Sequence, residues 1–406
     1  MSTLLFTGAA EIITSTAATT DIVLRNASLL VVDGHVRSIG DVSAHDVADD
    51  AMHVDCSGCV ITPGFVDSHT HALFGGWRAA EYALRSRGVP YMEIARRGGG
   101  INASVRDIRA RSEEELVELA RPRIDAMLSG GTTTAEVKSG YGLDTASELK
   151  QLRAMRALQA HTPVELVPTF MGAHEFPDEY RDRRDDYVDI VVNEMIPAVA
   201  AEGLAVFCDV FMEPGVFTAA QTRRVLEAGA RHGLVPKLHA DELENSGAAE
   251  LAAELGAASA DHLGAISETG IRALAHSDTV ATLLPATLLF LGKARYAPAR
   301  RLIDAGATIA LATDFNPGSS PTTSMQLVLT LACSQMGMDP LEAIVAATAG
   351  GARALRLTDG TGTLAPGAPA DIAVWDVPDH RELPYRFGAT PLRGLWKRGL
   401  RVRPSL

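Results

Sequence analysis

The chain has 406 residues, of which 47% are hydrophobic and 21% charged, and its formal net charge is −13 at pH 7. This length suits one large domain, or a large domain and a small one, with the composition of an ordinary globular protein. The negative charge argues against a general nucleic-acid-binding protein, which would carry a basic surface. No apolar stretch of the sequence is long enough to cross a membrane. We therefore expect neither nucleic acid nor a membrane as a partner.

The N-terminus and the cysteines indicate in which cellular compartment the protein is expected. The N-terminus lacks the basic segment and long apolar core of a signal peptide. Cys56 and Cys59 have CxxC spacing, but no second pair of ligands completes a zinc site with them. We expect a cytoplasmic protein whose cysteines, which also include Cys208 and Cys333, behave mostly as small buried apolar residues.

Residues 1–61 are predicted to form the first part of a small β-domain. Apolar runs over 22–24, 29–32, 36–39 and 52–54 have the length of short strands. Asp33-Gly34 and Gly40-Asp41 separate three of these runs, and Asp-Gly between apolar runs is a hairpin signal. No long helix fits this part of the sequence.

From residue 62 to about residue 360 strand-like and helix-like segments alternate. Strand candidates are 60–68, 132–137, 164–170, 205–210, 234–238, 257–261, 279–284 and 308–313. Helices are predicted over 112–128, 145–160, 187–202, 218–232, 248–255, 268–276 and 298–305. Ser112 and Glu115 have capping-box spacing, Asp144 can cap the second helix, and Pro122 is predicted to kink the first. Eight strands that alternate with helices predict an α/β fold, a (β/α)8 TIM-like barrel.

Residues 361–406 return to short strands, predicted over 371–376 and 400–402. Both ends of the chain show this pattern of short strands, whereas the middle alternates strands with helices. We therefore predict one small β-sandwich domain formed from both termini, residues 1–61 and 361–406, beside the barrel of residues 62–360.

A pair of histidines, His69 and His71, follows the apolar run 60–68. In a strand, residues i and i+2 point to the same face, so two imidazoles can hold one metal ion. Three later strand candidates lead to His239, His262 and Asp314. Each of these alone is explained as well by an ordinary core or loop residue. Together they predict a site at the strand ends of a barrel.

The chemistry of these side chains suits a catalytic metal. Zinc binds histidine nitrogen and carboxylate oxygen, and a catalytic site keeps one position open for water. Glu242 comes three residues after His239 and is a candidate general acid–base, which takes a proton from the metal-activated water and later gives it to the leaving nitrogen. The alternative interpretation of Glu242 is an acid at a helix N-terminus. His262 could hydrogen-bond the attacking hydroxide or the substrate carbonyl oxygen, or be structural.

The segment 62–71 resembles the first metal motif of the amidohydrolase superfamily. Further motifs resemble the imidazolonepropionase family, and they lie at 74–78, 98–101, 131–134, 138–142, 172–174, 239–242 and 313–319. The resemblance covers nearly the whole chain. The motifs at 138–142 and 314–319 are the most specific, whereas the histidine pair alone indicates only the superfamily.

The resemblance implies hydrolysis of 4-imidazolone-5-propanoate to N-formimidoyl-L-glutamate in histidine degradation, with one Zn²⁺ or Fe³⁺ per chain and a homodimer. The implied metal ligands are His69, His71, His239 and Asp314. Arg78 would face the substrate propionate, because a guanidinium can bind a carboxylate through two hydrogen bonds. The other implied substrate contacts are Tyr141, His174, Glu242, Asn316, Gly318 and Ser319. Without the resemblance, Arg78 reads as a surface ion pair, Tyr141 as a loop anchor and His174 as a capping residue.

Three other functions remain open at this stage. A binuclear amidase of the carboxylated-lysine kind would need a lysine at the end of the fourth barrel strand, and residues 204–213 contain none. A mononuclear purine or pyrimidine deaminase could share the metal ligands and Glu242, but it needs no carboxylate clamp such as Arg78. A non-catalytic metal-binding protein has no use for Glu242. The sequence does not choose between zinc and iron, since both accept nitrogen and oxygen ligands.

Overall fold

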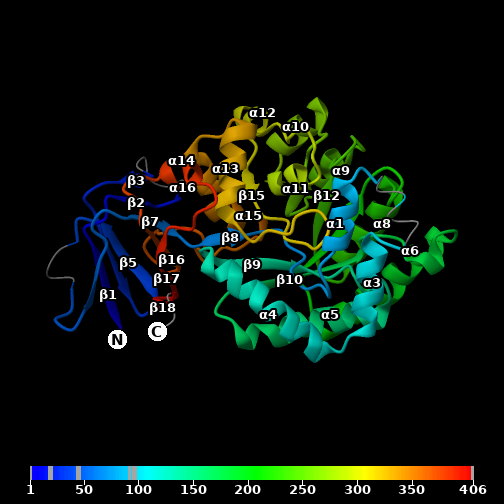
Figure 1. The fold of residues 1–406 in the computed structure, drawn as a ribbon, viewed down its shortest axis with the longest axis horizontal. Coiled ribbons are helices and arrows are strands. Elements are labelled where there is room, and N and C mark those ends of the chain that lie inside the picture. The colour runs from blue at the N-terminus through cyan, green and yellow to red at the C-terminus, as the bar shows by residue number, and fades with distance from the viewer. Residues whose placement is uncertain (1, 17–21, 43–46, 90–92, 94–97, 404–406) are drawn as a thin grey trace.

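The computed structural model describes residues 2–16, 22–42, 47–89, 93 and 98–403. Its centre is an eight-stranded parallel sheet surrounded by helices (Figure 1), so the predicted (β/α)8 barrel is confirmed. The strands lie in sequence order: β8 (Phe65–Asp67), β9 (Thr132–Lys138), β10 (Glu165–Ala173), β11 (Phe207–Met212), β12 (Val235–Ala240), β13 (Ser259–His262), β14 (Val280–Leu283) and β15 (Ile309–Leu311).

The barrel closes through the segments that follow its first and last strands. The ladder order of the described strands ends at β15 on one side and β8 on the other. Asp67 joins the two ends, since its carboxylate accepts hydrogen bonds from the backbone N–H of Thr313 (3.0 Å) and from its hydroxyl (2.6 Å). The backbone N–H of Asp314 donates to the carbonyl of His69 (3.0 Å). Barrel closure therefore fixes His69 against Asp314.

The predicted helices are present with small shifts at their ends. They are α4 (Glu113–Ser129), α5 (Thr145–Leu158), α6 (Arg184–Ile190), α7 (Ile196–Glu202), α8 (Ala219–Arg231), α9 (Ala248–Glu254), α10 (Glu268–Ala275) and α12 (Ala299–Asp304). The capping box of Ser112 and Glu115 and the cap at Asp144 are confirmed. Pro122 lies inside α4, and its kink stays a prediction. The helix predicted over 187–202 begins earlier and contains a π-helical turn between α6 and α7.

Several helices were not predicted from the sequence. They are α1 (Ala79–Ser86), α3 (Ile101–Ala110), α11 (Pro285–Phe290), α13 (Met325–Met336), α14 (Pro340–Val345), α15 (Gly351–Ala354) and α16 (Glu382–Tyr385). Of these, α1 has no buried residue, whereas most of α13 is buried. Among all helices of the described residues, none has the length and apolar character needed to cross a membrane.

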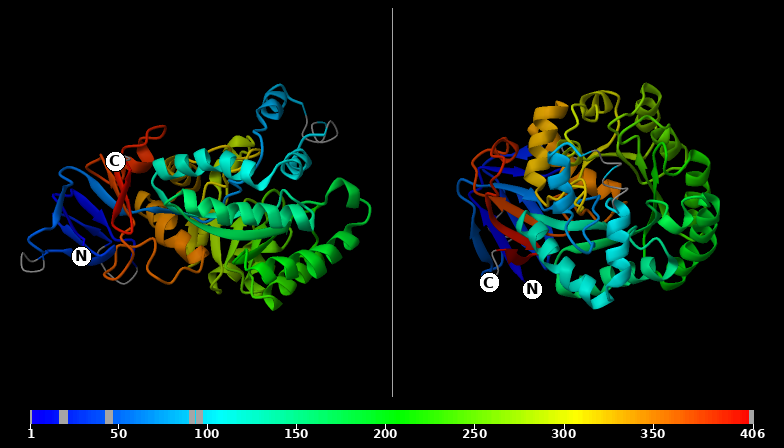
Figure 2. Two further views of the ribbon diagram at one scale, coloured as in Figure 1. Left: turned by 90° about the horizontal axis from the view of Figure 1, so that it is seen from below. Right: turned by 45° about the vertical axis from the view of Figure 1, so that its right-hand side comes forward.

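Two further sheets are built from the ends of the chain. A four-stranded sheet has the order β5-β4-β1-β6, and a six-stranded sheet has the order β18-β17-β16-β7-β2-β3. Their bounds are β1 (Thr3–Thr7), β2 (Glu11–Ile13), β3 (Val23–Leu24), β4 (Ser28–Val32), β5 (His35–Gly40), β6 (Met52–Asp55), β7 (Val60–Pro63), β16 (Ile372–Trp375), β17 (Leu392–Lys397) and β18 (Leu400–Arg403). Phe6 and Trp396 pack edge to face between the sheets, with ring centroids 5.0 Å apart. Figure 2 shows both chain ends on this side of the barrel.

The apolar run 60–68 is not the single strand that the sequence indicates. β7 pairs with β16 and β2 in the terminal sheet, whereas β8 pairs with β9 in the barrel. Gly64 lies between them, where a Cβ atom would come within 2.3 Å of the Thr133 side chain. His69 and His71 consequently follow β8 rather than end a long strand. The predicted boundary between residues 61 and 62 falls inside β7, and the domain boundaries stay a prediction.

The cysteines are free in the structure. Cys56, Cys59 and Cys208 are buried, and Cys333 is partly buried. Cys59 donates its thiol hydrogen bond to the carbonyl of Ser57 (3.8 Å) within the turn that leads to β7. The expected role of these cysteines as small buried residues agrees with this arrangement.

Trp375 connects the terminal sheet to the barrel. It belongs to β16, yet its fully buried ring packs on Phe65 of β8, with ring centroids 5.3 Å apart. Its indole N–H donates to the hydroxyl of Thr62 at 2.8 Å. Gly131, at φ +96°, faces the same ring, and a Cβ atom there would lie 2.6 Å from the Trp375 Cη2 atom. The contact between the two parts of the chain therefore requires glycine at this position.

We predict that Gly131→Ala destabilises the protein by more than backbone strain alone. Gly367 provides the control, because it has φ +91° but a Cβ atom added there would meet no other atom within 4 Å. Gly367→Ala should lower the free energy of unfolding by about 1–2 kcal/mol. Gly131→Ala should exceed that by about 1–3 kcal/mol, because the methyl group also overpacks against Trp375. Urea denaturation of both variants measures the difference, and equal losses would contradict it.

Candidate active site

The predicted metal ligands converge at the carboxyl ends of the barrel strands. His69 and His71 follow β8, His239 lies in β12, and Asp314 follows β15. All four side chains are buried. His262, the last residue of β13, joins them. The donor atoms of two groups lie within 4.8 Å of one another, namely His69, His71 and Asp314, and His69, His239 and His262.

The donor atoms suit a cation. Nε2 of His69 and Nε2 of His71 lie 3.5 Å and 3.6 Å from Oδ1 of Asp314. Nε2 of His239 lies 3.4 Å from Nε2 of His71. His69 Nε2 is buried with no hydrogen-bond partner among the described residues. Converging nitrogen lone pairs beside a carboxylate are the donor set of a zinc or iron site, so these residues fit a metal ion.

Burial keeps the imidazoles unprotonated. It lowers the pKa of His69 and of His71 well below the usual value, and the charges of neighbouring groups, Lys138 and other histidines among them, add to the effect. The pKa of His262 is lowered in the same way, first by burial and then by His239. Metal binding requires the neutral imidazole, so these rings are in the form that binds a metal.

Two carboxylates orient the imidazole rings, and the sequence analysis did not identify them as site residues. Asp261 Oδ2 lies 2.6 Å from Nδ1 of His69, and Asp209 Oδ1 lies 3.1 Å from Nδ1 of His239. An Nδ1–H that donates to a carboxylate leaves Nε2 as the metal-binding atom. Each aspartate stands within an apolar strand candidate. A charged residue in an apolar strand is rare unless it has a partner. This pattern could have indicated both aspartates from the sequence.

Glu242 lies at the edge of this cluster, just after β12. Glu213, at the end of β11, accepts hydrogen bonds from the backbone N–H groups of Glu242 (3.2 Å) and Glu244 (2.7 Å) and so holds this loop. Glu242 Oε2 lies 3.7 Å from Nε2 of His262, and its side chain is only 11% exposed. Burial raises the pKa of Glu242 to about 8, helped by the charges of Asp314 and Glu213. The carboxyl can therefore gain and lose a proton near neutral pH.

Tyr141 and His174 form the wall beside His71. The rings of His174 and His71 stack with centroids 5.0 Å apart, and Tyr141 lies 5.3 Å from His174. Nδ1 of His174 is 2.9 Å from the carbonyl of Gly140. The buried carboxylate of Glu148 holds this loop, since it accepts hydrogen bonds from the backbone N–H groups of Gly140, Gly142 and Leu143. These hydrogen bonds fix the rings of Tyr141 and His174, here called the ring wall, to the start of α5.

Arg78 lies next to the turn at 316–319. Its guanidinium donates through Nε (3.0 Å) and Nη2 (2.8 Å) to Glu81 Oε2. This ion pair is also what the alternative interpretation of Arg78 predicts. A Cβ atom at Gly318 would lie 2.4 Å from Arg78 Nη1, so glycine permits this approach. Asn316 ties the turn to the ligand, because its amide donates to the carbonyl of Asp314 (2.6 Å) and accepts from the N–H of Ser319 (2.7 Å).

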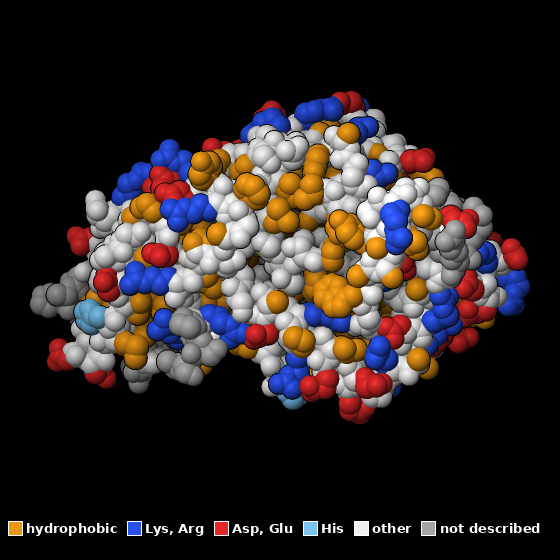
Figure 3. Space-filling model, in the orientation of Figure 1, with side chains coloured by type: hydrophobic (Ala, Val, Ile, Leu, Met, Phe, Trp, Pro, Cys, Tyr) orange, Lys and Arg blue, Asp and Glu red, His pale blue; other side chains and the backbone are white. Residues whose placement is uncertain are grey.

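Apolar side chains gather on the rim near Arg78. Figure 3 shows them over the region of α1 and α11. Trp77, Tyr82 and Leu289 are exposed there, and the ring of Tyr82 stacks on Phe290 with centroids 4.9 Å apart. Contacts link the predicted site residues to their neighbours, from Tyr141 beside His71, through Asn316 bonded to Asp314, to Gly318 beside Arg78. Their individual roles stay predictions.

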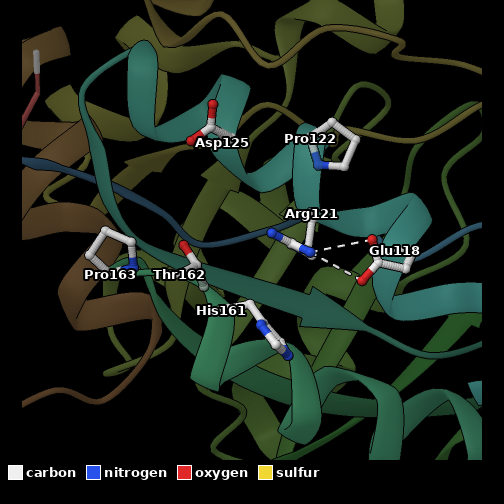
Figure 4. Close-up of a pocket in the computed structure, with 7 residues that line it drawn as sticks. All are labelled: Glu118, Arg121, Pro122, Asp125, His161, Thr162 and Pro163. Atoms are coloured by element: carbon white, nitrogen blue, oxygen red, sulfur yellow. Dashed lines mark hydrogen bonds and ion pairs between the residues drawn. The ribbon is translucent and has the colours of Figure 1, made fainter. Parts of the chain in front are cut away.

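A separate surface hollow of about 400 Å³ lies along α4 (Figure 4) and contains none of the predicted site residues. Its lining residues are Glu118, Arg121, Pro122, Asp125, His161, Thr162 and Pro163. Arg121 donates to the carboxylate of Glu118 at 3.1 Å, and Asp125 pairs with Arg403, which lies outside the lining. This hollow is distinct from the predicted site at the strand ends.

Comparison with known proteins shows what the chain is similar to. The amidohydrolase family model matches residues 60–401. An imidazolonepropionase from Symbiobacterium thermophilum is 49% identical over 382 residues, which cover 93% of this chain and 90% of that protein. An imidazolonepropionase from Myxococcus xanthus is 51% identical over 346 residues, which cover 85% of this chain and 82% of that protein. The structure of an adenosine deaminase from Xanthomonas campestris with bound zinc shares the fold, with a TM-score of 0.73 at 19% identity over 98% of this chain and 92% of that one.

Fold, buried donor set and sequence similarity point to one family. The family model spans the barrel strands and most of the C-terminal sheet strands. The two relatives share about half of their aligned residues with this chain. The chain therefore belongs to the imidazolonepropionases of the amidohydrolase family.

Proposed function

We propose that this chain hydrolyses 4-imidazolone-5-propanoate, a cyclic amide with a propionate side chain, to N-formimidoyl-L-glutamate in histidine degradation. The observation that carries the proposal is the gathering of buried imidazole and carboxylate donors in two groups that share His69, beside Glu242. Two relatives named imidazolonepropionase, each about half identical to this chain, support the same reaction.

The proposed metal ligands are His69, His71, His239 and Asp314, which would hold one Zn²⁺ or Fe³⁺ ion. When bound, such an ion acts as a Lewis acid that activates a water molecule for attack. The fourth barrel strand, β11, carries no lysine, the residue that a carboxylated-lysine centre for two metals needs. This absence supports a single metal ion per chain.

Glu242 is the proposed general acid–base. It would accept a proton from the attacking water and give it to the ring nitrogen that leaves when the C–N bond breaks. Burial raises the pKa of Glu242 to about 8 in the protein without metal, and a bound cation would lower it again, so that the carboxylate could accept the first proton. His262, whose Nε2 faces the Glu242 carboxylate, is proposed to donate a hydrogen bond to the substrate carbonyl oxygen.

The substrate is proposed to bind between the ring wall and the turn at 316–319. Arg78 would bind its propionate, with Glu81 keeping the guanidinium oriented. Tyr141 and His174 would contact the imidazolone ring, and Asn316, Gly318 and Ser319 would line the opposite side. Excluding water from this buried pocket would strengthen each polar contact with the substrate.

The alternative is a mononuclear deaminase of the purine or pyrimidine type. The fold and the donor set suit it equally, but a free base has no carboxylate for Arg78 to bind. Assays with adenine and cytosine beside freshly made imidazolone propanoate distinguish the two reactions. The homodimer and the cytoplasmic location expected from the sequence also stay predictions.

We predict one tightly bound metal ion per chain that activity requires. Elemental analysis should give one equivalent of zinc or iron. Removal by a chelator should abolish the loss of imidazolone absorbance, and one equivalent of the metal found should restore it. Two ions per chain, both needed for full activity, would contradict the single-metal site.

We predict that Glu242→Gln retains the metal but lowers kcat by about 100- to 10,000-fold, because the amide cannot carry the proton. Glu244→Gln is the matched control, since Glu244 is exposed two residues later in the same loop. Its kcat should stay near that of the unmodified protein. Turnover by the Glu242 variant within a few-fold of the control would move the proton transfer elsewhere, first to His262.

We predict that Arg78→Met keeps the metal content but lowers kcat/KM by about 10- to 150-fold. This factor corresponds to about 1.5–3 kcal/mol for lost hydrogen bonds between charged groups. Arg87→Met is the control, because Arg87 is an exposed arginine that follows α1. Steady-state kinetics of both variants provide the measurement. An unchanged kcat/KM for Arg78→Met would show that another group binds the propionate.

A further inference from the structure

Besides Asp67, a group of five charged side chains lies fully buried in the described barrel strands beneath the metal ligands. They are Glu136 and Lys138 of β9, Asp209 of β11, Lys237 of β12 and Asp261 of β13. Buried charges are stable only when they are paired and hydrogen-bonded. The three carboxylates and two ammonium groups carry a formal net charge of −1. None of them is a proposed metal ligand or a proposed substrate contact.

Lys138 is the centre of this group. Its Nζ lies 2.6 Å from Glu136 Oε1 and 2.7 Å from Asp209 Oδ2, with Asp261 Oδ2 at 3.8 Å. Glu136 is itself held by the hydroxyl of Thr169 at 2.5 Å. Burial lowers the pKa of Lys138, but the charges of Asp209, Glu136 and Asp261 outweigh burial and raise that pKa above its usual value. The ammonium group is therefore charged.

Asp209 connects Lys138 to a metal ligand. One carboxylate oxygen, Oδ2, accepts from Lys138, and the other, Oδ1, lies 3.1 Å from Nδ1 of His239. With Oδ2 held, the carboxylate plane is fixed, and so is the direction of the hydrogen bond to the imidazole. Residues that orient a metal-binding histidine in this way change metal affinity when they are altered.

We propose that Lys138 is a positioning residue that acts through Asp209 to aim Nε2 of His239 at the metal. The proposal rests on the metal site of the proposed function. It makes a prediction opposite to that of simple electrostatics. Removing a positive charge near a bound cation should tighten metal binding by Coulomb's law. Losing a positioning residue should weaken it.

The test compares Lys138→Met with Lys397→Met. Lys397 is also a buried lysine with two carboxylate partners, Asp371 at 2.7 Å and Glu165 at 3.2 Å, but it lies in the terminal sheet away from the ligands. Metal-free protein is titrated with Zn²⁺ against a chromogenic chelator, and thermal midpoints are recorded with and without the ion. Lys138→Met should bind Zn²⁺ about 10- to 100-fold more weakly. Lys397→Met should lose thermal stability but keep its affinity within about threefold.

Three further variants identify the route. Asp209→Asn should weaken Zn²⁺ binding, and adding Lys138→Met to it should weaken binding little more, because both changes break one connection. Lys138→Arg, which keeps the charge, should recover most of the affinity.

Several results would overturn the proposal. These are Zn²⁺ binding by Lys138→Met that is unchanged or tighter, losses that add in the double variant, or an Arg variant as weak as Met. If Lys138→Met does not fold, unchanged Zn²⁺ affinity of Asp209→Asn overturns the proposal equally. An unmodified protein that binds no Zn²⁺ or Fe³⁺ would instead remove the metal site of the proposed function.

Discussion

The site depends on the hydrogen bonds that close the barrel between its first and last strands. Asp67 and Thr313 are 246 positions apart, and two hydrogen bonds join them inside the barrel. Two backbone hydrogen bonds join the same segments. The N–H of Asp314 donates to the carbonyl of His69, and the N–H of His71 donates to the carbonyl of Phe315. These short segments carry three of the four proposed ligands. The contacts that close the barrel therefore also place that part of the donor set.

The sequence predicted those features that are local or repetitive. Alternating strands and helices indicated the barrel, and capping residues such as Ser112 indicated helix starts. The proposed ligands were singled out because each follows a strand candidate, and barrel sites gather at such ends. The prediction of one strand over 60–68 was wrong because both halves of the run are apolar. Only the pairing partners, β16 for one half and β9 for the other, separate them.

The charged network could not be predicted, because it depends on register between strands. Asp209 stands opposite Lys237, and His239 stands opposite Asp261, on neighbouring parallel strands. A shift of one residue in either pair would turn an orienting carboxylate to the other face of the sheet. The sequence shows that charges occur in apolar runs, but it does not show which of them meet.

The residues of the proposed site fall into two groups that differ in how firmly the fold holds them. The ligands and their carboxylate partners stand on barrel strands or directly after them and are buried from every side, which holds reactive atoms in place. Arg78 instead precedes α1, a helix with no buried residue, which is held by surface contacts such as Arg85 with the carbonyl of Gly318 and Tyr82 stacked on Phe290. Arg78, a proposed substrate contact, thus lies on a less buried element than the proposed ligands do. Its guanidinium charge is already balanced by Glu81 in the structure.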